Sequence, residues 1–506
     1  MPRVIQCLAA TAVVMFCVQV FSDNKADVDL WGNVGFVRSP PWSGSYHDTN
    51  TFSFTEPDTS WVNHEWLAEY ALNRVYTFLG NPGLLLLKIA LGLLVVALVH
   101  SSMSRSGLSG PGRFLVLLLI VSTMGYGFST RPHHFTYLLT AVFLWVLRHS
   151  RRRALVLFGL PALGALWANL HGAFLAGALL LVVRTAGEAC RALSRQRPDA
   201  RTNDLPLLAA ATALFLGATL LNPYGVRLWR FVFASAALVR PYLSEWAAFH
   251  PLHDFWTHVD FVVLVALGGA ALAFSRTPKD PVWMAVLAVS LVAALVLRRN
   301  IPLFAVVVGF VLPPHLAACA NRPLERLQRR VSRPLLAAIL AAFVAVSARY
   351  AYAFHKEQPF QIEVPRERFP VDLVAGMQAH ALSGHALVFF DWAEYCIWKL
   401  YPRCRVFLDG RFLSAYHERT IRDYFRFLYA DEDWDAALTD YPTDIVLIHT
   451  GNPVYARMVG REGWVQVART DLAALFLKES AHGPFLARLR AGNTGLVQPA
   501  TETVFP

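Results

Sequence analysis

Charged residues are scarce in this chain. Lys, Arg, Asp and Glu make up 16% of its 506 residues, whereas soluble domains average about 25%. Hydrophobic residues make up 55%, and the mean hydropathy is +0.39. This composition excludes an ordinary soluble protein and indicates a polytopic membrane protein.

Ionisable residues are also lacking where an ion-coupled transporter needs them. Apart from Lys88, near one end of its segment, the centres of the apolar blocks contain no Lys, Arg, Asp or Glu. Pumps and transporters usually carry such residues at mid-depth. The sequence therefore disfavours a transporter of lipid-linked glycans, although that class and a non-catalytic scaffold whose C-terminal domain binds a partner stay as alternatives.

Two further absences limit the cofactors. No G-x-G-x-x-G or G-x-x-x-x-G-K-[ST] motif occurs, so we expect no nucleotide cofactor. None of the six cysteines has a metal-ligand spacing with another Cys or His. The spacing of Cys396 and Cys404 permits a disulfide without requiring one.

The apolar residues are grouped in blocks that can cross about 30 Å of hydrocarbon, some only with their flanking residues. We predict about eleven transmembrane helices in residues 1–350 and a soluble α/β domain in residues 351–506. The first block is interpreted as a retained helix, because no A-x-A-like cleavage site precedes Asp27. The blocks are Val4–Phe21, Gly83–Val99, Phe114–Phe128, Phe135–Leu147, Ala154–Trp167, Ala173–Val183, Leu205–Leu221, Phe261–Phe274, Val282–Leu297, Ile301–Leu312 and Leu335–Ser347.

Basic residues set the orientation. With the N-terminus in the cytoplasm, the basic connections "RHSRRR" and "NRPLERLQRRVSR" fall inside, as the positive-inside rule requires. The net charge of +11 is then largely cytoplasmic, and nucleic acid is not an expected partner. The loop 22–82, several short turns and the C-terminal domain face outward.

The first outer loop carries acids and aromatics. Asp27 and Asp29 stand near its start, and "WVNHEWLAEY" near its end contains His64 and Glu65. We predict a helix from about Trp61, capped by Asp58, Thr59 or Ser60. It would lie on the membrane surface with Glu65, Glu69 and Asn73 on its solvent-exposed side. Glu69 is interpreted as a solvated acid, and Glu65 is either that or a functional carboxylate.

Cations gather at the other predicted outer turns. Arg298 and Arg299 stand on the side that the positive-inside rule disfavours. A lipid phosphate would explain them, because guanidinium groups bind phosphate oxygens in pairs. Membrane-anchoring side chains are the alternative. The other polar residues at these turns are Arg131, His133, Asn169 and His171.

Acids, cations and aromatics at one membrane face suit sugar transfer from a polyprenyl-phosphate carrier. A carboxylate can remove the proton of an acceptor hydroxyl. Cations can stabilise the departing lipid phosphate. Aromatic side chains can pack on the sugar and the prenyl chain.

A family resemblance rests on these same segments. A first helix, early acids ("DVDLW"), a surface helix ("WVNHEWLAEYAL") and outer "RP", "NLHG" and "RRN" turns resemble the GT-C-type multipass glycosyltransferases. The likeness covers roughly the first 350 residues, and is closest to poorly characterised bacterial members and to mannosyl- and aminoarabinose-transferase relatives. It implies a bacterial inner-membrane protein with a catalytic acid in the first outer loop and an undecaprenyl-type sugar donor. A divalent cation, present in some members, and a soluble outer C-terminal domain are also implied.

By position, Asp29 matches the family's acid best, followed by Asp27 and Glu65. The compact acid pair that is common in the family is spread here as Asp27-Val28-Asp29. That departure leaves the identity of the base and a metal requirement open. The sequence names neither the sugar nor the glycan, lipid or protein acceptor.

Overall fold

The computed structural model describes residues 3–36, 49–57, 59–194, 205–237, 243–491, 496–497 and 503–506. The chain is mostly helical and contains a five-stranded sheet. It divides into two compact units. The helical unit comprises residues 1–24, 83–232 and 236–360, and the sheet unit comprises residues 25–82, 233–235 and 361–506. Residues 25–82, which make up most of the predicted first outer loop, therefore pack with the C-terminal residues.

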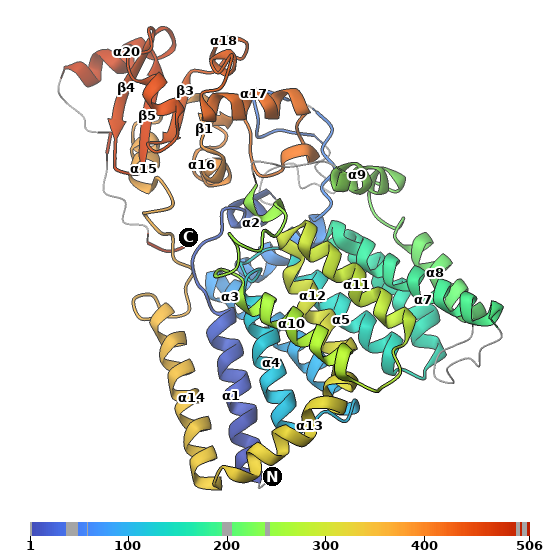
Figure 1. The fold of residues 1–506 in the computed structure, drawn as a ribbon. Helices are drawn as coiled ribbons and strands as arrows, with labels where there is room; N and C mark the ends of the chain where they lie inside the picture. Colours follow the sequence, from blue (N-terminus) through green and yellow to red (C-terminus); the bar gives the residue numbers. More distant parts are fainter. Residues whose placement is uncertain are drawn as a thin grey trace. The chain divides into compact units, whose positions relative to one another are not determined.

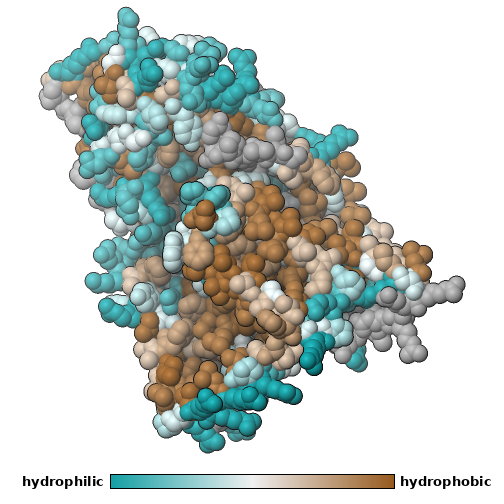
Figure 2. Space-filling view, in the orientation of Figure 1, coloured by the Kyte–Doolittle hydropathy of each residue, from teal (hydrophilic) through white to brown (hydrophobic). Residues whose placement is uncertain are grey.

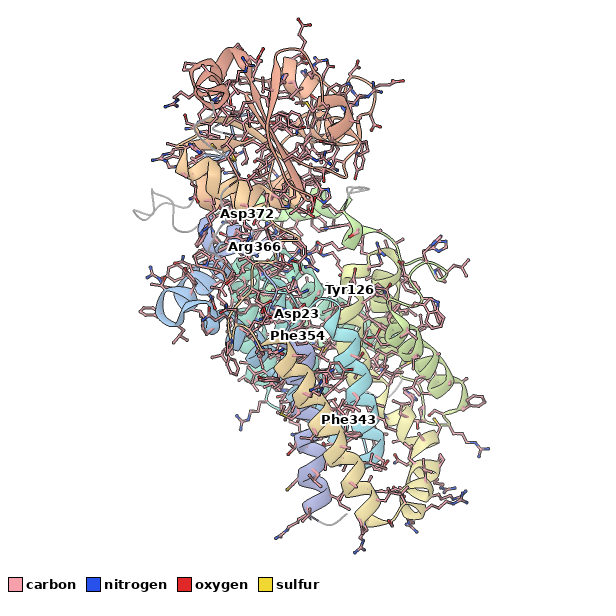
Figure 3. All side chains as sticks on the ribbon, turned by 90° about the vertical axis from the view of Figure 1, so that its left-hand side faces the viewer. Asp23, Tyr126, Phe343, Phe354, Arg366 and Asp372 are labelled. Atoms are coloured by element: carbon pink, nitrogen blue, oxygen red, sulfur yellow. The ribbon has the colours of Figure 1, made fainter. Side chains whose placement is uncertain are left out.

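Three long elements line one part of the helical unit. In Figure 1, α1 (Arg3–Phe21), α4 (Gly110–Gly125) and α14 (Arg333–Phe354) run side by side. Phe343 of α14 packs against Phe16 and Phe114, with ring centroids 5.7 and 6.2 Å apart (Figure 3). The flank of the unit seen in Figure 2 is predominantly hydrophobic, with hydrophilic residues at the end where α13 lies. A surface of this kind suits contact with lipid hydrocarbon.

Several helices are suited to crossing a membrane. Among the described residues, α1, α3 (Trp66–Arg105), Gly172–Leu193 and α14 are long and apolar enough, and the bent pair Arg298–Val311 and Pro313–Arg330 would make a fifth span. Five shorter apolar helices accompany them. The membrane class is confirmed, whereas the number of about eleven spans stays a prediction. The remaining helices of this unit are α5 (His133–His149), α6 (Leu160–Leu170), α7 (Leu175–Leu193), α8 (Leu205–Ala218), α9 (Val226–Ala237), α10 (Val259–Phe274), α11 (Pro281–Val296), α12 (Ile301–Val311) and α13 (Pro313–Arg330).

Part of the basic connections is helical. α7 continues to Leu193, and within it the buried Arg184 pairs with Glu188 at 3.1 Å. Arg191 bonds Glu188 at 2.7 Å and Asp280 at 2.5 Å. Each buried charge thus has a partner of opposite sign, which is the condition for burying it. The sequence pattern showed that this segment is polar, but it did not show which acidic and basic side chains form ion pairs.

The C-terminal sheet has five strands, which lie at the apolar, β-branched runs from which the α/β domain is predicted: "HALVFF", "RVFLDG", "DIVLIH", "WVQVAR" and "ALFLKE". They are β1 (Gly384–Val388), β2 (Cys404–Val406), β3 (Ile445–His449), β4 (Trp464–Arg469) and β5 (Ala473–Lys478). The order is β2-β1-β3-β5-β4. β1 is parallel to β2 and β3, and β5 is antiparallel to β3 and β4. Figure 1 shows helices around this sheet: α15 (Val371–Ala379), α16 (Ala393–Leu400), α17 (Glu418–Tyr429), α18 (Ala436–Thr439), α19 (Val454–Met458) and α20 (Glu479–Arg490).

The first outer loop is built into the sheet unit. Ser53 forms a parallel bridge with Val406 at the outer edge of β2. The hydroxyl groups of Ser53 and Thr55 both donate to the carbonyl oxygen of Phe407, at 3.2 and 2.7 Å. These bonds pair backbone groups that an edge strand would otherwise leave open.

Glu56 fastens the same loop to α17. Its carboxylate accepts hydrogen bonds from the Thr420 hydroxyl at 2.6 Å, the Thr59 hydroxyl at 3.0 Å and the His417 backbone N–H at 3.2 Å. His417 Nδ1 lies 2.6 Å from Oε2, the oxygen that also accepts from Thr59. Burial acts to raise the pKa of Glu56, but these hydrogen bonds outweigh it and hold the pKa below its ordinary value.

We expect Glu56→Gln to lower the stability of the sheet unit by about 1.5–3 kcal/mol at neutral pH, because hydrogen bonds to a charged acceptor are lost. A carboxyl group with a lowered folded pKa stabilises above its unfolded pKa and loses that contribution as pH falls through the folded pKa. Urea unfolding below and above pH 4.5 should therefore show a smaller acid-induced loss in the variant. An equal acid-induced loss in the variant, or a similar effect of Glu432→Gln at an exposed position, would contradict this prediction.

The predicted surface helix differs from expectation. α3 begins at Trp66 rather than near Trp61, because the Asn63 side chain accepts from the Glu65 N–H at 3.1 Å and forms a turn there. Asp58, one predicted cap, lies outside the described residues. A non-helical residue, Gly80, breaks α3.

The polar side of this helix is buried rather than solvated, so that part of the prediction was wrong. Glu69 is 4% exposed and accepts from the Asn63 amide at 2.7 Å. Asn73 is also buried and donates to the Val34 carbonyl oxygen at 3.0 Å. Polar contacts with the rest of the sheet unit, which the helical periodicity does not reveal, decide which side is covered.

Candidate functional site

The candidate base Asp29 stands at the start of α2 (Leu30–Gly35), and its side chain is half-buried. Its carbonyl oxygen accepts from the Asn33 N–H at 2.9 Å, and its own N–H donates to the Asp27 carboxylate at 3.0 Å. Asp27 therefore serves the turn that leads into α2. Its carboxylate is engaged with the backbone, whereas that of Asp29 makes no capping bond to α2.

Glu394, on α16, lies beside Asp29 within the sheet unit. One of its oxygens accepts from the Gly32 N–H at 2.9 Å. Burial raises the pKa of the Glu394 carboxyl well above its ordinary value, and the charges of Asp29 and Asp409 act in the same direction. The sheet unit thus supplies a carboxyl group that favours its neutral form next to the candidate base.

A buried ion pair completes this group. Arg411 donates from Nε and Nη2 to the two oxygens of Asp409, at 2.9 and 2.7 Å. Asp409 is fully buried and also accepts from the Tyr416 hydroxyl at 2.6 Å. The guanidinium lies 4.8–5.1 Å from the ring centroids of three aromatic residues, Phe36, Phe52 and Trp61. We call Asp29, Glu394, Asp409 and Arg411 the carboxylate cluster.

The carboxylate cluster does not fit a metal ion. Within the described part of the chain, no group of three or more His, Cys, Asp and Glu side chains is arranged to hold one. Asp409 is committed to Arg411 and Tyr416, and one oxygen of Glu394 accepts from the Gly32 N–H. We therefore derive no step through a divalent cation.

Glu65 and His64 form a second acidic position of the same unit. His64 Nε2 lies 3.5 Å from a Glu65 oxygen, and the two side chains are 28% and 22% exposed. The Glu65 backbone is fixed by Asn63, the same residue that bonds Glu69. Glu65 thus remains an accessible carboxylate candidate, whereas Glu69 is not one.

The predicted cations lie together in the helical unit. Glu245 bridges Arg131 and Arg299, with N–O distances of 3.1 and 3.7 Å. Arg298 pairs with Asp254 at 2.6 Å. We call these five residues the arginine cluster; it holds three cations and two acids, and Arg299 also lies 4.3 Å above the ring of Trp246.

The other outer-turn residues have structural contacts. His133 Nε2 lies 2.5 Å from the Gly127 carbonyl oxygen. The Asn169 amide donates to Ala165 and Leu221 carbonyl oxygens at 2.7 and 2.8 Å. His171 is buried, and its Nδ1 accepts from the Ala173 N–H at 3.2 Å. These contacts favour a packing role for Asn169 and His171, while a role in binding stays a prediction.

The sequence also predicts that acids and cations of the outer face line one outward cavity: Asp29, Glu65, Arg131, His171 and Arg298 or Arg299. This stays a prediction. Asp29 and Glu65 belong to the sheet unit, and Arg131, His171, Arg298 and Arg299 belong to the helical unit. In Figure 3, Asp23 follows α1, Tyr126 follows α4, and both are in the helical unit, whereas Arg366 and Asp372, 3.3 Å apart, are in the sheet unit.

Sequence reasoning missed Glu394 and undervalued Asp409 and Arg411. The signal for the last two is "DGR" directly after the apolar run "RVFL". In the sequence alone this segment is interpreted as a turn with a nearby ion pair rather than as part of a site. No local pattern marks Glu394, which lies within the helical "AEYCIWKL". Cys396 and Cys404 are buried free thiols, so the permitted disulfide is not formed.

Comparison with known proteins concerns the fold. No family model and no curated sequence matches this chain. The archaeal oligosaccharyltransferase AglB from Archaeoglobus fulgidus, in complex with an inhibitory peptide and a dolichol-phosphate, is similar over 88% of this chain and 69% of its own, with a TM-score of 0.57 and 12% identity. ArnT from Cupriavidus metallidurans is similar over 93% of this chain and 97% of its own at 12% identity. Its TM-score is 0.54 in the apo state and 0.50 when bound to undecaprenyl phosphate. At such identity the likeness establishes the fold alone, and at that level it confirms that the chain resembles the GT-C-type multipass membrane glycosyltransferases.

Proposed function

We propose that this protein transfers a sugar from a polyprenyl-phosphate-linked donor to an acceptor hydroxyl at the outer face of the bacterial cytoplasmic membrane. Its N-terminus would be cytoplasmic and its sheet unit extracytoplasmic, as the basic connections favour. Two solved structures with this fold hold a dolichol-phosphate and an undecaprenyl phosphate. The observation that carries the proposal is the half-buried first-loop carboxylate of Asp29 on that fold.

The reaction is a single displacement. The acceptor oxygen forms a bond to the anomeric carbon while the bond from that carbon to the phosphate oxygen breaks. The acceptor proton passes to Asp29, and the electron pair leaves with the lipid phosphate. Attack from the face opposite the phosphate inverts the anomeric configuration.

The arginine cluster would receive the lipid phosphate. Its arginines already hold carboxylates, Glu245 and Asp254, and a phosphate oxygen offers the same acceptor chemistry. A phosphate that replaces Glu245 would keep Arg131 and Arg299 paired. When no lipid donor is bound, the carboxylates pair with the guanidinium groups, so the protein does not bear the free-energy cost of leaving them unpaired.

The proposal is tested in a strain that lacks the protein. A lipid-linked sugar should accumulate in its lipid extract, and mass spectrometry would identify that sugar. Purified protein should then consume the accumulated lipid and release the polyprenyl phosphate. Unchanged lipid-linked sugars, together with no turnover of any extracted fraction by the purified protein, would favour the scaffold or transporter alternative.

We expect Arg299→Ala to raise the KM for the lipid donor about 10- to 100-fold, because a charge-assisted hydrogen bond to phosphate is worth about 1.5–3 kcal/mol. The turnover number should change less. Arg151→Ala, at an exposed arginine of the helical unit, is the matched control and should leave KM unchanged. Equal KM values for the wild-type protein and Arg299→Ala would remove the phosphate role of this cluster.

A further inference from the structure

The Glu394 carboxyl group lies in a cradle of two glycines from distant parts of the chain. The Gly32 N–H donates to one of its oxygens, and a Cβ atom at Gly32 would be only 2.4 Å from that oxygen. A Cβ atom at Gly410 would be 2.4 Å from the other oxygen, Oε1. Real Cβ atoms do not approach an oxygen so closely, so each position requires glycine for this carboxyl group to fit.

Oε1 of Glu394 faces Asp29 across Gly410. The Cβ position at Gly410 lies 2.4 Å from Glu394 Oε1 and 3.2 Å from Asp29 Oδ1. The separation of these two oxygens is therefore at most the sum of the two distances. The other charged groups near Glu394 are Asp409 and Arg411, and these are paired to each other through two hydrogen bonds. Asp29 is therefore a charged neighbour of Glu394 outside that ion pair.

Two carboxylates this close in a buried place cannot both be ionised without a large cost in free energy. Glu394 is the more buried of the two, at 6% exposure, and so keeps the proton. A proton on Oε1 would then lie on the side of the carboxyl group that faces Asp29, while Oε2 accepts from the Gly32 N–H. Donor and acceptor groups match on both sides of the carboxyl group.

We propose that Glu394 is a positioning residue for Asp29: its neutral carboxyl group, held between Gly32 and Gly410, donates a hydrogen bond that fixes the Asp29 carboxylate in the orientation needed to accept a proton. Glu394 keeps its own proton throughout the transfer, and Asp29 alone takes the acceptor's proton. This inference rests on the proposed function, because Asp29 acts as a base only there. It also makes the sheet unit a part of the catalytic apparatus rather than an accessory domain.

Transfer by the purified protein tests this role, with the lipid-linked sugar extracted from the deletion strain as donor. Glu394→Gln keeps an N–H donor and an oxygen acceptor in the same shape, so it should retain transfer within about threefold at neutral pH. Glu394→Leu removes both and should lower the turnover number at least tenfold. The wild-type rate should fall as pH rises through the raised pKa of Glu394, and that fall should be absent in Glu394→Gln. A loss in Glu394→Gln as large as in Glu394→Leu, or an unchanged alkaline fall, would overturn the proposal.

A measurement without substrate separates this inference from the proposed function. Because the folded pKa of Glu394 is raised, its stabilising contribution is complete below the unfolded pKa and is lost as pH rises through the folded pKa. Unfolding of the wild-type protein should therefore become easier as pH rises through the raised pKa of Glu394, and Glu394→Gln should reduce this effect while Glu432→Gln should not. An alkaline effect that is equal in all three proteins would contradict the neutral carboxyl group. No transfer by the wild-type protein at any pH would instead overturn the proposed function, and the catalytic role of Glu394 with it.

Discussion

Asp29→Asn is expected to lower sugar transfer by about 10²–10⁴-fold, the usual contribution of a general base. The amide has nearly the same shape as the carboxylate but cannot accept the acceptor's proton. The protein should remain folded, because the Asp29 backbone carbonyl, not its side chain, bonds the first turn of α2. Single-turnover transfer with extracted donor, together with a thermal unfolding curve, measures both effects.

Two neighbouring variants show whether Asp29 is the base. Asp27→Asn keeps an oxygen that can accept from the Asp29 N–H, so its loss of activity should be much smaller. Glu65→Gln should likewise retain most of the activity. Full activity in Asp29→Asn combined with a large loss in Glu65→Gln would transfer the role of base to Glu65.

Asp409→Asn is expected to destabilise the sheet unit by about 3–5 kcal/mol, the usual cost of leaving one partner of a buried ion pair uncompensated. Asp409 is fully buried and Arg411 is 8% exposed, so water cannot replace the lost charge. The three aromatic rings around Arg411 offer only their faces to the guanidinium. Urea unfolding monitored by tryptophan fluorescence measures the change.

An exposed ion pair of the same unit provides the control. Asp435 and Arg461 lie 2.7 Å apart, with side chains 36% and 32% exposed. Asp435→Asn should cost less than about 1 kcal/mol, as is typical of pairs that water can solvate. Equal losses in the two variants would mean that the Asp409–Arg411 pair gains nothing from its burial.

The parts of the fold that depend on local pattern were predictable. β-branched runs ending in turn residues predicted the strands from "HALVFF" to "ALFLKE", and the hairpin at Thr470-Asp471 joins β4 to β5. The start of α3 was missed by five residues, because Asn63 forms a turn where Trp61 suggested a helix. Hydropathy alone also overlooked the buried pairing of Arg184 with Glu188.

The composition of the candidate site depends on long-range packing that no window of sequence contains. Asp29 was chosen as a candidate because it stands in the predicted first outer loop, where the family resemblance implies a catalytic acid. Glu394 could not be found in this way, since its partners Gly32 and Asp29 are more than 300 residues away in the chain. Similarly, Glu69 lies on what looks like the polar side of an interfacial helix, yet contact with Asn63 and the surrounding unit buries it.

The packing of residues 25–82 against residues 361–506 within one unit has a consequence for folding during biosynthesis. The partners Gly32 and Glu394 are 362 positions apart, and Ser53 and Phe407 are 354 apart. At about 5–20 residues per second, a ribosome needs roughly 20–70 s to make that intervening stretch. During that interval Leu30 and Trp31, both buried in the finished protein, have yet to meet their neighbours. The newly synthesised loop therefore cannot complete its folding until the last third of the polypeptide has been made. A chaperone that shields the loop during this interval would raise the yield of mature protein.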